Sequence, residues 1–556
     1  MAKPKENKRV FSVSPSVDGC KKKSEESPSS GKESKLSGRK KPGKDGRSEA
    51  QRDVDRILYS AAWRRLGGVT QVWTPFGDRP LLHNRLTHSL KVSQIAKGVA
   101  EKLLMDKGNR DTLASLGGLD VDVCVAAAMA HDIGHPPFGH IGEKILDDAA
   151  REILKLEDGF EGNAQSLRIV STRRLRKADY QGMDLSVATL AAITKYPWSR
   201  APKRPEGEHE QSLRSDPSYR KHWYKFNFYQ SNSHILKDIR SWSPVGDEIQ
   251  TLEASVMDLA DDISYSVHDI EDFIYSGILS PNAVLFEMEK YLELLGLDTT
   301  PNTTKEEVKK TLEGVDYPGG IDDRAARDED VSSLNGIERK TEEVIFRDSG
   351  LGKLAKKLSL DYHGWFDPTC FVFGVVSLSR FFEGLTYSYL GERRVPMEAD
   401  VHSMASNLVE RFLKELEVSR IPFWIGGPHV MVGKQAWHEI QILKFITKTY
   451  VVDHPDTALL QRGQSHIILE LVDLLLKWVK NDFERLPYQL QVWIRESQMV
   501  SANGELIGYG RGQFSCGPEK NRAIIDYICT LTDEECMVLY RKLTGQLVHH
   551  PFTVAF

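Results

Sequence analysis

The sequence predicts an all-α protein, because apolar residues recur at helical spacing from Asp53 onward while strand patterns are sparse. Only two short runs, 371–376 and 421–424, are candidates for strands. The chain has 556 residues, which is enough for a large buried core. We therefore expect a helical core, a helical C-terminal region and minor short strands.

Composition divides the chain into four segments. Residues 1–50 are basic, rich in Lys, Ser, Gly and Pro, and nearly free of large apolar residues, so we expect a disordered tail. Residues 51–297 hold the clearest helical patterns and all the motifs described below. Residues 298–349 are charged and punctuated by glycine, which indicates a surface insertion. Residues 350–556 return to helical patterns.

The expected helices follow in order along these segments. Each shows apolar residues at helical spacing, or an apolar run that ends at glycine or proline. They span 85–104, 121–132, 139–154, 252–275, 397–418, 466–480 and 532–545.

Charge and cysteine content exclude several classes of protein. A net charge of −5 does not by itself indicate a nucleic-acid-binding protein. Six scattered cysteines without a CxxC pair argue against a zinc ribbon and a disulfide framework. The longest apolar run, 123–130, is too short to cross a bilayer, and no secretory signal is visible. We expect a reduced, cytoplasmic protein without membrane contact. For the basic tail, weak binding to single-stranded nucleic acid is the alternative to a plain solvated segment, which we favour.

The strongest local signal is the stretch AHDIGHPPFGHIGE, residues 130–143, with three histidines and two carboxylates. Imidazole and carboxylate together suit a divalent transition metal. His131 and Asp132 point in different directions on a regular helix, but both can reach one ion where the helix ends before Pro136. A polar helix terminus is the ordinary alternative, and it would account for an isolated His-Asp pair.

Two distant segments weaken that alternative. His88 lies near the start of an amphipathic helix, and Asp261 and Asp262 lie inside an apolar helical stretch. A buried carboxylate needs a partner, because burying it unpaired is prohibitively costly. Two histidines and two aspartates would leave coordination positions for water and for a phosphate oxygen.

This H…HD…D pattern resembles the HD-domain phosphohydrolase superfamily, and its flanking text resembles the deoxyguanosinetriphosphate triphosphohydrolase (dGTPase) family. Six blocks occur in the family's order and cover roughly residues 50–280. They are RRLGGVTQVW at 64–73, NRLTHSLKVSQIA at 84–96, AHDIGHPPFGHIGE at 130–143, FEGNAQSLRI at 160–169, TKYPW at 194–198 and LADDISYSVHDIED at 259–272. The insertion and the segment 423–435 have no counterpart in the family's pattern.

The resemblance implies the ligands of a divalent ion, which we expect to be Mn²⁺, Mg²⁺ or another transition metal such as Fe²⁺, Ni²⁺ or Co²⁺. The implied ligands are His88, His131, Asp132 and Asp261. The residues alone leave the choice between Asp261 and Asp262 open.

The resemblance also implies a catalytic pair, His140 and Glu143. Their i,i+3 spacing sets them on one helix face, where the carboxylate would orient the imidazole for proton transfer or water activation. The ordinary alternative is a histidine and a glutamate placed near a helix N-terminus, where the helix dipole stabilises the carboxylate.

Further matches imply substrate contacts. Sugar-facing positions of the family correspond to Gln71, Tyr265 and Asp269, and phosphate-facing positions to Arg85 and Lys195. Taken singly, the two basic residues would more often be surface charges. Asn163 matches another pocket position, whose role the sequence does not specify.

The reaction implied is metal-dependent hydrolysis of a deoxynucleoside triphosphate, with dGTP favoured, to deoxynucleoside and inorganic triphosphate. The resemblance also suggests a homo-oligomer, with a hexamer as the candidate state. Two alternatives stand beside it: an HD hydrolase acting on an alarmone or cyclic dinucleotide, and a nucleic-acid-binding sensor that uses the same scaffold without catalysis.

Overall fold

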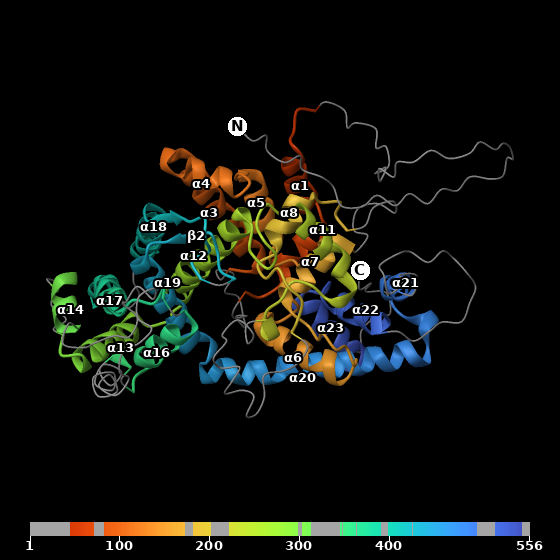
Figure 1. Ribbon diagram of the computed structural model, residues 1–556. Coiled ribbons are helices and arrows are strands. Elements are labelled where there is room, and N and C mark those ends of the chain that lie inside the picture. The colour runs from red at the N-terminus through yellow and green to blue at the C-terminus, as the bar shows by residue number, and fades with distance from the viewer. Residues whose placement is uncertain are drawn as a thin grey trace, which may run out of the picture.

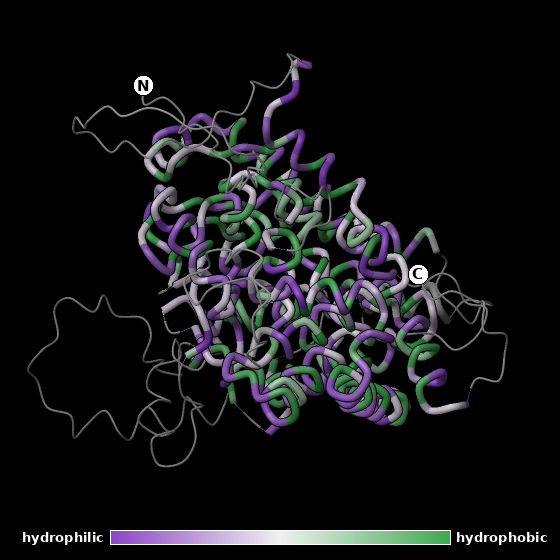
Figure 2. Tube along the Cα trace, turned by 90° about the vertical axis from the view of Figure 1, so that its right-hand side faces the viewer, coloured by the Kyte–Doolittle hydropathy of each residue, from purple (hydrophilic) through white to green (hydrophobic). Residues whose placement is uncertain are grey.

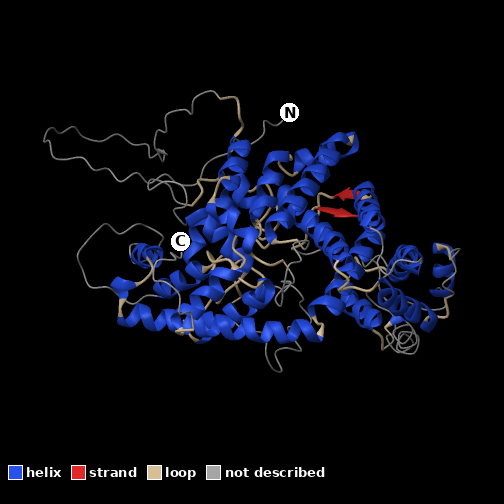
Figure 3. Ribbon diagram, turned by 180° about the vertical axis from the view of Figure 1, so that it is seen from behind, coloured by secondary structure: helices blue, strands red, loops and turns tan. Residues whose placement is uncertain are grey.

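The computed structural model describes residues 45–71, 83–172, 182–201, 222–297, 303–312, 345–346, 348–362, 364–390, 398–424, 426–497 and 518–546. Regular structure in these residues is almost entirely helical, apart from one small two-stranded sheet (Figure 3). The all-α prediction is confirmed. Most of the predicted tail and most of the predicted insertion lie outside the described residues.

By their order along the chain the elements form an N-terminal and a C-terminal group. The first comprises α1 (Glu49–Leu58), α2 (Ala61–Arg65), η1 (Leu66–Gly68), α3 (Arg85–Met105), η2 (Lys107–Asn109), α4 (Arg110–Ser115), α5 (Val121–Ala130), α6 (Gly139–Glu152), α7 (Gly162–Thr172), α8 (Val187–Ile193), η3 (Gln230–Asn232), α11 (Ser233–Trp242) and α12 (Leu252–Tyr275). The second comprises α13 (Pro281–Leu294), α14 (Lys305–Leu312), α16 (Gly350–Asp361), α17 (Pro368–Leu390), α18 (Glu398–Lys414), β1 (Leu416–Val418), β2 (Val430–Val432), α19 (Lys434–Thr447), η4 (Lys448–Val452), α20 (Pro455–Asn481), η5 (Phe483–Arg485), α21 (Tyr488–Ser497), α22 (Pro518–Ile528) and α23 (Asp533–Leu543). In Figure 1 helices α20 and α22 of the second group lie beside α6 of the first.

The helices α5 and α12 form the centre of the fold. α5 is rich in alanine and almost wholly buried, and its small side chains let α1, α3, α8 and α12 approach closely. α12 begins at Thr251, whose hydroxyl accepts a hydrogen bond from the backbone N–H of Ala254 at 3.2 Å. It packs against α3, α5, α18 and α19, so it joins the two groups of elements. Hydrophobic and hydrophilic residues alternate along the helices, as amphipathic packing requires (Figure 2).

The two strands do not lie where the sequence predicts them. Residues 371–376 belong to α17, a long helix packed against α13, α14, α18 and α19. A short buried apolar run has no pattern that separates strand from helix, and that prediction was wrong. Residues 421–424 form the connection between β1 and β2, which pair antiparallel with Leu416 opposite Val432.

Other helix limits shift by a few residues or more. The predicted helix over 397–418 ends at Lys414, because the chain passes into β1. α20 begins at Pro455, well before residue 466, and runs along the base of the molecule against α6 (Figure 1). The segment Pro368–Thr386 of α17 is long and apolar enough to span a bilayer, and 61% of it is buried inside the protein.

Candidate metal centre and active site

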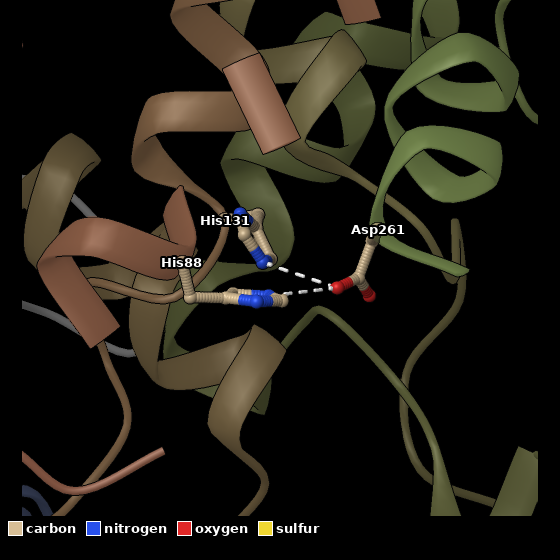
Figure 4. Close-up of side chains that lie close together, drawn as sticks. All are labelled: His88, His131 and Asp261. Carbon is tan, nitrogen blue, oxygen red and sulfur yellow. Dashed lines mark hydrogen bonds and ion pairs between the residues drawn. The ribbon is translucent and has the colours of Figure 1, made fainter. Parts of the chain in front are cut away.

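Three of the predicted ligands converge on one point (Figure 4). One side-chain donor atom from each of His88, His131 and Asp261 lies within 4.8 Å of the others. The Oδ1 atom of Asp261 is 3.2 Å from Nε2 of His88 and 3.6 Å from Nε2 of His131. The three residues come from α3, the end of α5 and the middle of α12, so the central helices bring them together.

Local structure fixes where each histidine points. Asn84 caps α3 by accepting a hydrogen bond from the backbone N–H of Thr87 at 3.0 Å, which sets the first turn that contains His88. His131 ends α5, and its Nδ1 lies 2.7 Å from the carbonyl oxygen of Ala128. In that contact Nδ1 donates to the carbonyl oxygen, so Nε2 is the nitrogen that faces the carboxylates.

Asp132 stands beside these residues and is held by a buried cation. Its Oδ1 is 3.5 Å from Nε2 of His131, and its Oδ2 accepts a hydrogen bond from Arg85 at 2.6 Å. His135 adds a further contact, with Nδ1 2.9 Å from Oδ1 of Asp132. Burial alone would raise the pKa of Asp132, but Arg85 and the histidines hold it well below its ordinary value. Asp132 is therefore an ionised carboxylate at neutral pH.

The adjacent aspartates of α12 face different partners. Asp261 turns toward the histidines and receives Lys195 on its other oxygen at 3.2 Å, whereas Asp262 pairs with Lys444 of α19 at 2.8 Å. Lys195 also lies 2.5 Å from Asp258, one turn earlier on the same helix. Although burial raises it, the pKa of Asp261 is held well below its ordinary value by Lys195 and the histidines.

The donor set fits a divalent ion. Two imidazole nitrogens and two carboxylates are borderline ligands that suit Mn²⁺, Fe²⁺ and similar cations. The Nε2 atom of His131 is buried, yet its nearest carboxylate oxygens lie 3.5 and 3.6 Å away, a spacing that suits donors sharing an ion better than a direct hydrogen bond. Burial lowers the pKa of His131, but Asp132 and Asp261 outweigh it and raise that pKa to about 9. A bound cation would take the place of the proton that these carboxylates otherwise favour on His131.

The second predicted pair lies at the start of α6. Nδ1 of His140 is 3.3 Å from Oε2 of Glu143, and the imidazole is half exposed. The other oxygen of Glu143 accepts hydrogen bonds from the backbone N–H of Gly162 and from Lys225, both at 3.2 Å. Lys225 also donates to Glu161 at 3.1 Å. Burial would raise the pKa of Glu143, but Lys225 and His140 hold it well below its ordinary value.

The face of α12 beyond Asp261 holds the two predicted sugar-facing residues. Tyr265 and Asp269 follow at successive turns, in line with Asp261. Asp269 is only 3% exposed, and its Oδ2 atom has no hydrogen-bond partner among the described residues. Burial and the nearby carboxylates of Asp272 and Asp261 raise the pKa of Asp269 well above its ordinary value. A buried carboxyl group without a partner indicates a place for a ligand's polar group.

The remaining predicted residues have more local partners. Gln71 is buried, and its backbone oxygen lies 3.5 Å from a guanidinium nitrogen of Arg85, while its side-chain oxygen has no partner among the described residues. The amide of Asn163 donates to Glu161 at 2.8 Å, not to the metal-binding group. Asn163 therefore lies at the Glu143–Lys225–Glu161 side of the site.

Several residues of the site were missed by sequence reasoning. His135 was within reach, since it is the second histidine of the same motif and touches Asp132. Lys225 and Asp258 gave no signal, because a single charged residue in a polar or helical stretch resembles any surface charge.

Comparisons with known proteins agree with this geometry. The family model described as HD domain matches residues 85–266. A deoxyguanosinetriphosphate triphosphohydrolase-like protein of Streptomyces coelicolor is 28% identical over 515 residues, which are 90% of this chain and 93% of that protein.

Two further relatives are more similar over shorter stretches. Deoxyguanosinetriphosphate triphosphohydrolase-like protein 2 of Mesorhizobium japonicum is 40% identical over 44% of this chain and 50% of its own length. The deoxyguanosinetriphosphate triphosphohydrolase-like protein of Corynebacterium diphtheriae is 41% identical over 42% of this chain and 48% of its own. The aligned part therefore spans about half the length of each of these two relatives. The chain thus contains a match to the HD domain over residues 85–266 and is similar to deoxyguanosinetriphosphate triphosphohydrolase-like proteins.

Proposed function

We propose that the protein hydrolyses deoxynucleoside triphosphates, with dGTP favoured, to deoxynucleoside and inorganic triphosphate. One observation supports this above all: the donor atoms of His88, His131 and Asp261 lie within 4.8 Å of one another. Asp261 belongs to α12, and the next two turns of that helix carry Tyr265 and Asp269. A phosphate-binding centre and a sugar-binding face thus follow one another along α12.

The ion itself would be held by His88, His131, Asp132 and Asp261. A divalent cation in this position supplies Lewis-acid polarisation of a phosphate oxygen and lowers the pKa of water. The protein's own cations add to the neutralisation of phosphate charge. Lys195 lies 3.2 Å from Asp261, and Arg85 is buried against Asp132 at 2.6 Å, so both flank the expected position of the triphosphate.

The reaction consists of attack by water on the α-phosphorus and cleavage of its bond to the 5′-oxygen. The water oxygen ends on the triphosphate, and the 5′-oxygen leaves with a proton as the deoxynucleoside hydroxyl. His140 presents its Nε2 for this proton transfer, because its Nδ1 faces Glu143. Glu143 orients the imidazole, while Lys225 keeps the carboxylate ionised.

Sugar selection follows from the buried face of α12. The ring of Tyr265 would lie beside C2′ and leave no partner for a ribose hydroxyl there. The Oδ2 atom of Asp269, which has no hydrogen-bond partner among the described residues, and the amide of Gln71 would bind the remaining sugar hydroxyl. The preference for dGTP and a homo-oligomeric, hexameric assembly are parts of the proposal that rest on the family resemblance.

The test is a panel of each dNTP and NTP with Mn²⁺ or Mg²⁺, run on the wild type and on two neighbouring variants. We expect dNTP turnover by the wild type, loss of turnover and of bound metal in Asp261→Asn, and retention of both in Asp262→Asn. Turnover of an alarmone or a cyclic dinucleotide without dNTP turnover would replace the proposal with another HD hydrolase. Binding of single-stranded nucleic acid without any turnover would favour the sensor alternative.

A further inference from the structure

The helix α23 contacts the segment between α5 and α6, residues 131–138, through one buried carboxylate. This segment is called the active-site loop. Asp533 is the first residue of α23 and is 6% exposed. Its Oδ1 accepts a hydrogen bond from the backbone N–H of Phe138 at 2.9 Å. Its Oδ2 accepts one from the backbone N–H of Thr70 at 3.1 Å and another from the Thr70 hydroxyl. One side chain thus joins α23 to two segments that precede it by 395 and 463 residues in the sequence.

Both segments lead directly into proposed active-site residues. Phe138 is the N-cap of α6 and has no capping side chain of its own, and His140 follows two residues later. Its backbone is left-handed, with φ 66°, a conformation that a bulky residue adopts only where its surroundings hold it. Thr70 immediately precedes Gln71. Asp533 therefore contacts Phe138, which directly precedes α6, and Thr70, which directly precedes Gln71.

The two segments also touch each other at Gly139. A Cβ atom there would lie 3.2 Å from the carbonyl oxygens of Thr70 and Gln71, and the residue is left-handed with φ 58°. The position of α6 relative to Gln71 is thus set by close backbone contact. A small movement of either segment would separate His140 from the sugar-binding face.

A second set of contacts holds the N-terminal end of α23 in place. Arg65, which is buried, donates from Nε to the carbonyl oxygen of Leu531 and from Nη2 to that of His135, both at 2.8 Å. A Cβ atom on Gly68 would lie 2.6 Å from the methyl group of Thr532, so η1 and the start of α23 are in direct contact. The position of Asp533 against the loop is therefore fixed from both sides.

We propose that Asp533 is a positioning residue for catalysis, which holds the start of α6 and the segment ending at Gln71 in register with each other. The inference rests on the proposed function for its effect on turnover, but the contact that it describes is independent of the substrate. Because misplacement of a catalytic group by about 1 Å can reduce the rate by about 10²-fold, the contact is expected to affect the catalytic rate more than folding.

The experiment compares Asp533→Ala and Asp533→Asn with a control in the same helix turn. Glu535→Ala removes the exposed capping-box partner of Thr532, which stabilises α23 without touching the loop. We expect kcat for dGTP to fall about 10- to 100-fold in Asp533→Ala, with metal content unchanged and a smaller change in KM. Asp533→Asn, which keeps one acceptor oxygen, should lie between this variant and wild type. Glu535→Ala should lower the unfolding temperature but leave kcat within about twofold.

Hydrogen exchange measured without substrate reports how firmly these segments are held, independently of turnover. In Asp533→Ala, the backbone amides of residues 138–143 and 68–71 should exchange faster, while α3 and α12 stay protected. Uniformly faster exchange throughout the core, or wild-type kcat with unchanged exchange in 138–143, would overturn the proposal. If the wild type turned over no dNTP but showed this exchange pattern, the proposed function would fail and the positioning contact would stand. Should Asp533→Ala not fold, Asp533→Asn is judged by the same two outcomes.

Discussion

Two buried histidines, His131 in the metal centre and His438 in α19, show how the surroundings decide what a histidine does. Both have Nδ1 against a backbone oxygen, Ala128 for His131 at 2.7 Å and Lys434 for His438 at 2.6 Å. Nε2 of His438 accepts a hydrogen bond from the backbone N–H of Asp367 at 3.1 Å, so both of its nitrogens are used.

The pKa values of the two imidazoles move in opposite directions. His438 packs among aromatic rings, and burial lowers its pKa to about 4. His131 is just as buried, yet the carboxylates of Asp132 and Asp261 raise its pKa to about 9. Burial of a histidine is therefore no sign of function. Neighbouring carboxylates, rather than burial, distinguish the histidine of the metal centre from the structural one.

The largest effect is expected in the metal centre. His131→Ala or Asp132→Ala should abolish both metal retention and hydrolysis while the helical circular-dichroism signal is retained, because each removes a donor that no neighbour replaces. His438→Ala should do the reverse, with a loss of stability of about 1–4 kcal/mol and normal metal content. Metal analysis and dGTP turnover of the three purified variants would measure this. Near-normal activity of either metal-centre variant with stoichiometric metal would refute the ligand assignment.

A smaller effect is expected at His140, which contacts a carboxylate but is half exposed. His140→Ala should reduce kcat by about 10²- to 10⁴-fold, the usual range for a general acid–base group. Metal content should stay close to that of the wild type. If metal were lost together with activity, His140 would have to be a ligand or a structural residue instead.

The next effect concerns the sugar. A ribose hydroxyl buried beside Tyr265 without a partner costs about 1–3 kcal/mol, so the wild type should favour dGTP over GTP by roughly ten- to a hundredfold in kcat/KM. Tyr265→Ala should narrow this ratio by opening space at C2′. Equal turnover of GTP and dGTP by the wild-type protein would show that this face of α12 does not discriminate between the sugars.

A last effect, on stability rather than on turnover, is the pH dependence at His438. Because its pKa in the folded protein is lowered to about 4 while the unfolded chain binds the proton near 6.5, its neutral form favours folding above pH 6.5. That contribution is lost as the pH falls from 6.5 toward 4, by up to about 3 kcal/mol. Urea unfolding at pH 7 and pH 4.5 should show a smaller loss for His438→Gln than for the wild type. Equal losses would mean that the imidazole is accessible to protons in the native protein.

Much of the fold was predictable because the long helices have strong periodic patterns. The helix over 252–275 begins and ends where the sequence places it, since Thr251 supplies a cap and the apolar face is continuous. Residues 371–376 were misassigned, because a fully buried helix loses the alternation between faces that marks it as a helix.

Local spacing alone indicated the candidate-site residues that cluster in one motif, whereas His88 and Asp261 needed the order of several motifs along the chain. His131, Asp132, His140 and Glu143 lie within a short stretch, so their types and spacing indicated chemistry. The contact of Asp533 with Phe138 depends on how two distant segments pack, and no local pattern encodes it.

The most direct test of the proposed activity is the identity of the first product formed from dGTP with Mn²⁺. Attack on the α-phosphorus with departure of the 5′-oxygen requires deoxyguanosine and intact inorganic triphosphate in equal amounts from the earliest time points. Ion-exchange chromatography and phosphorus NMR would follow the two products. We predict that pair, with no intermediate diphosphate or monophosphate. Initial formation of dGDP or dGMP would contradict the account, even if dGTP were consumed rapidly.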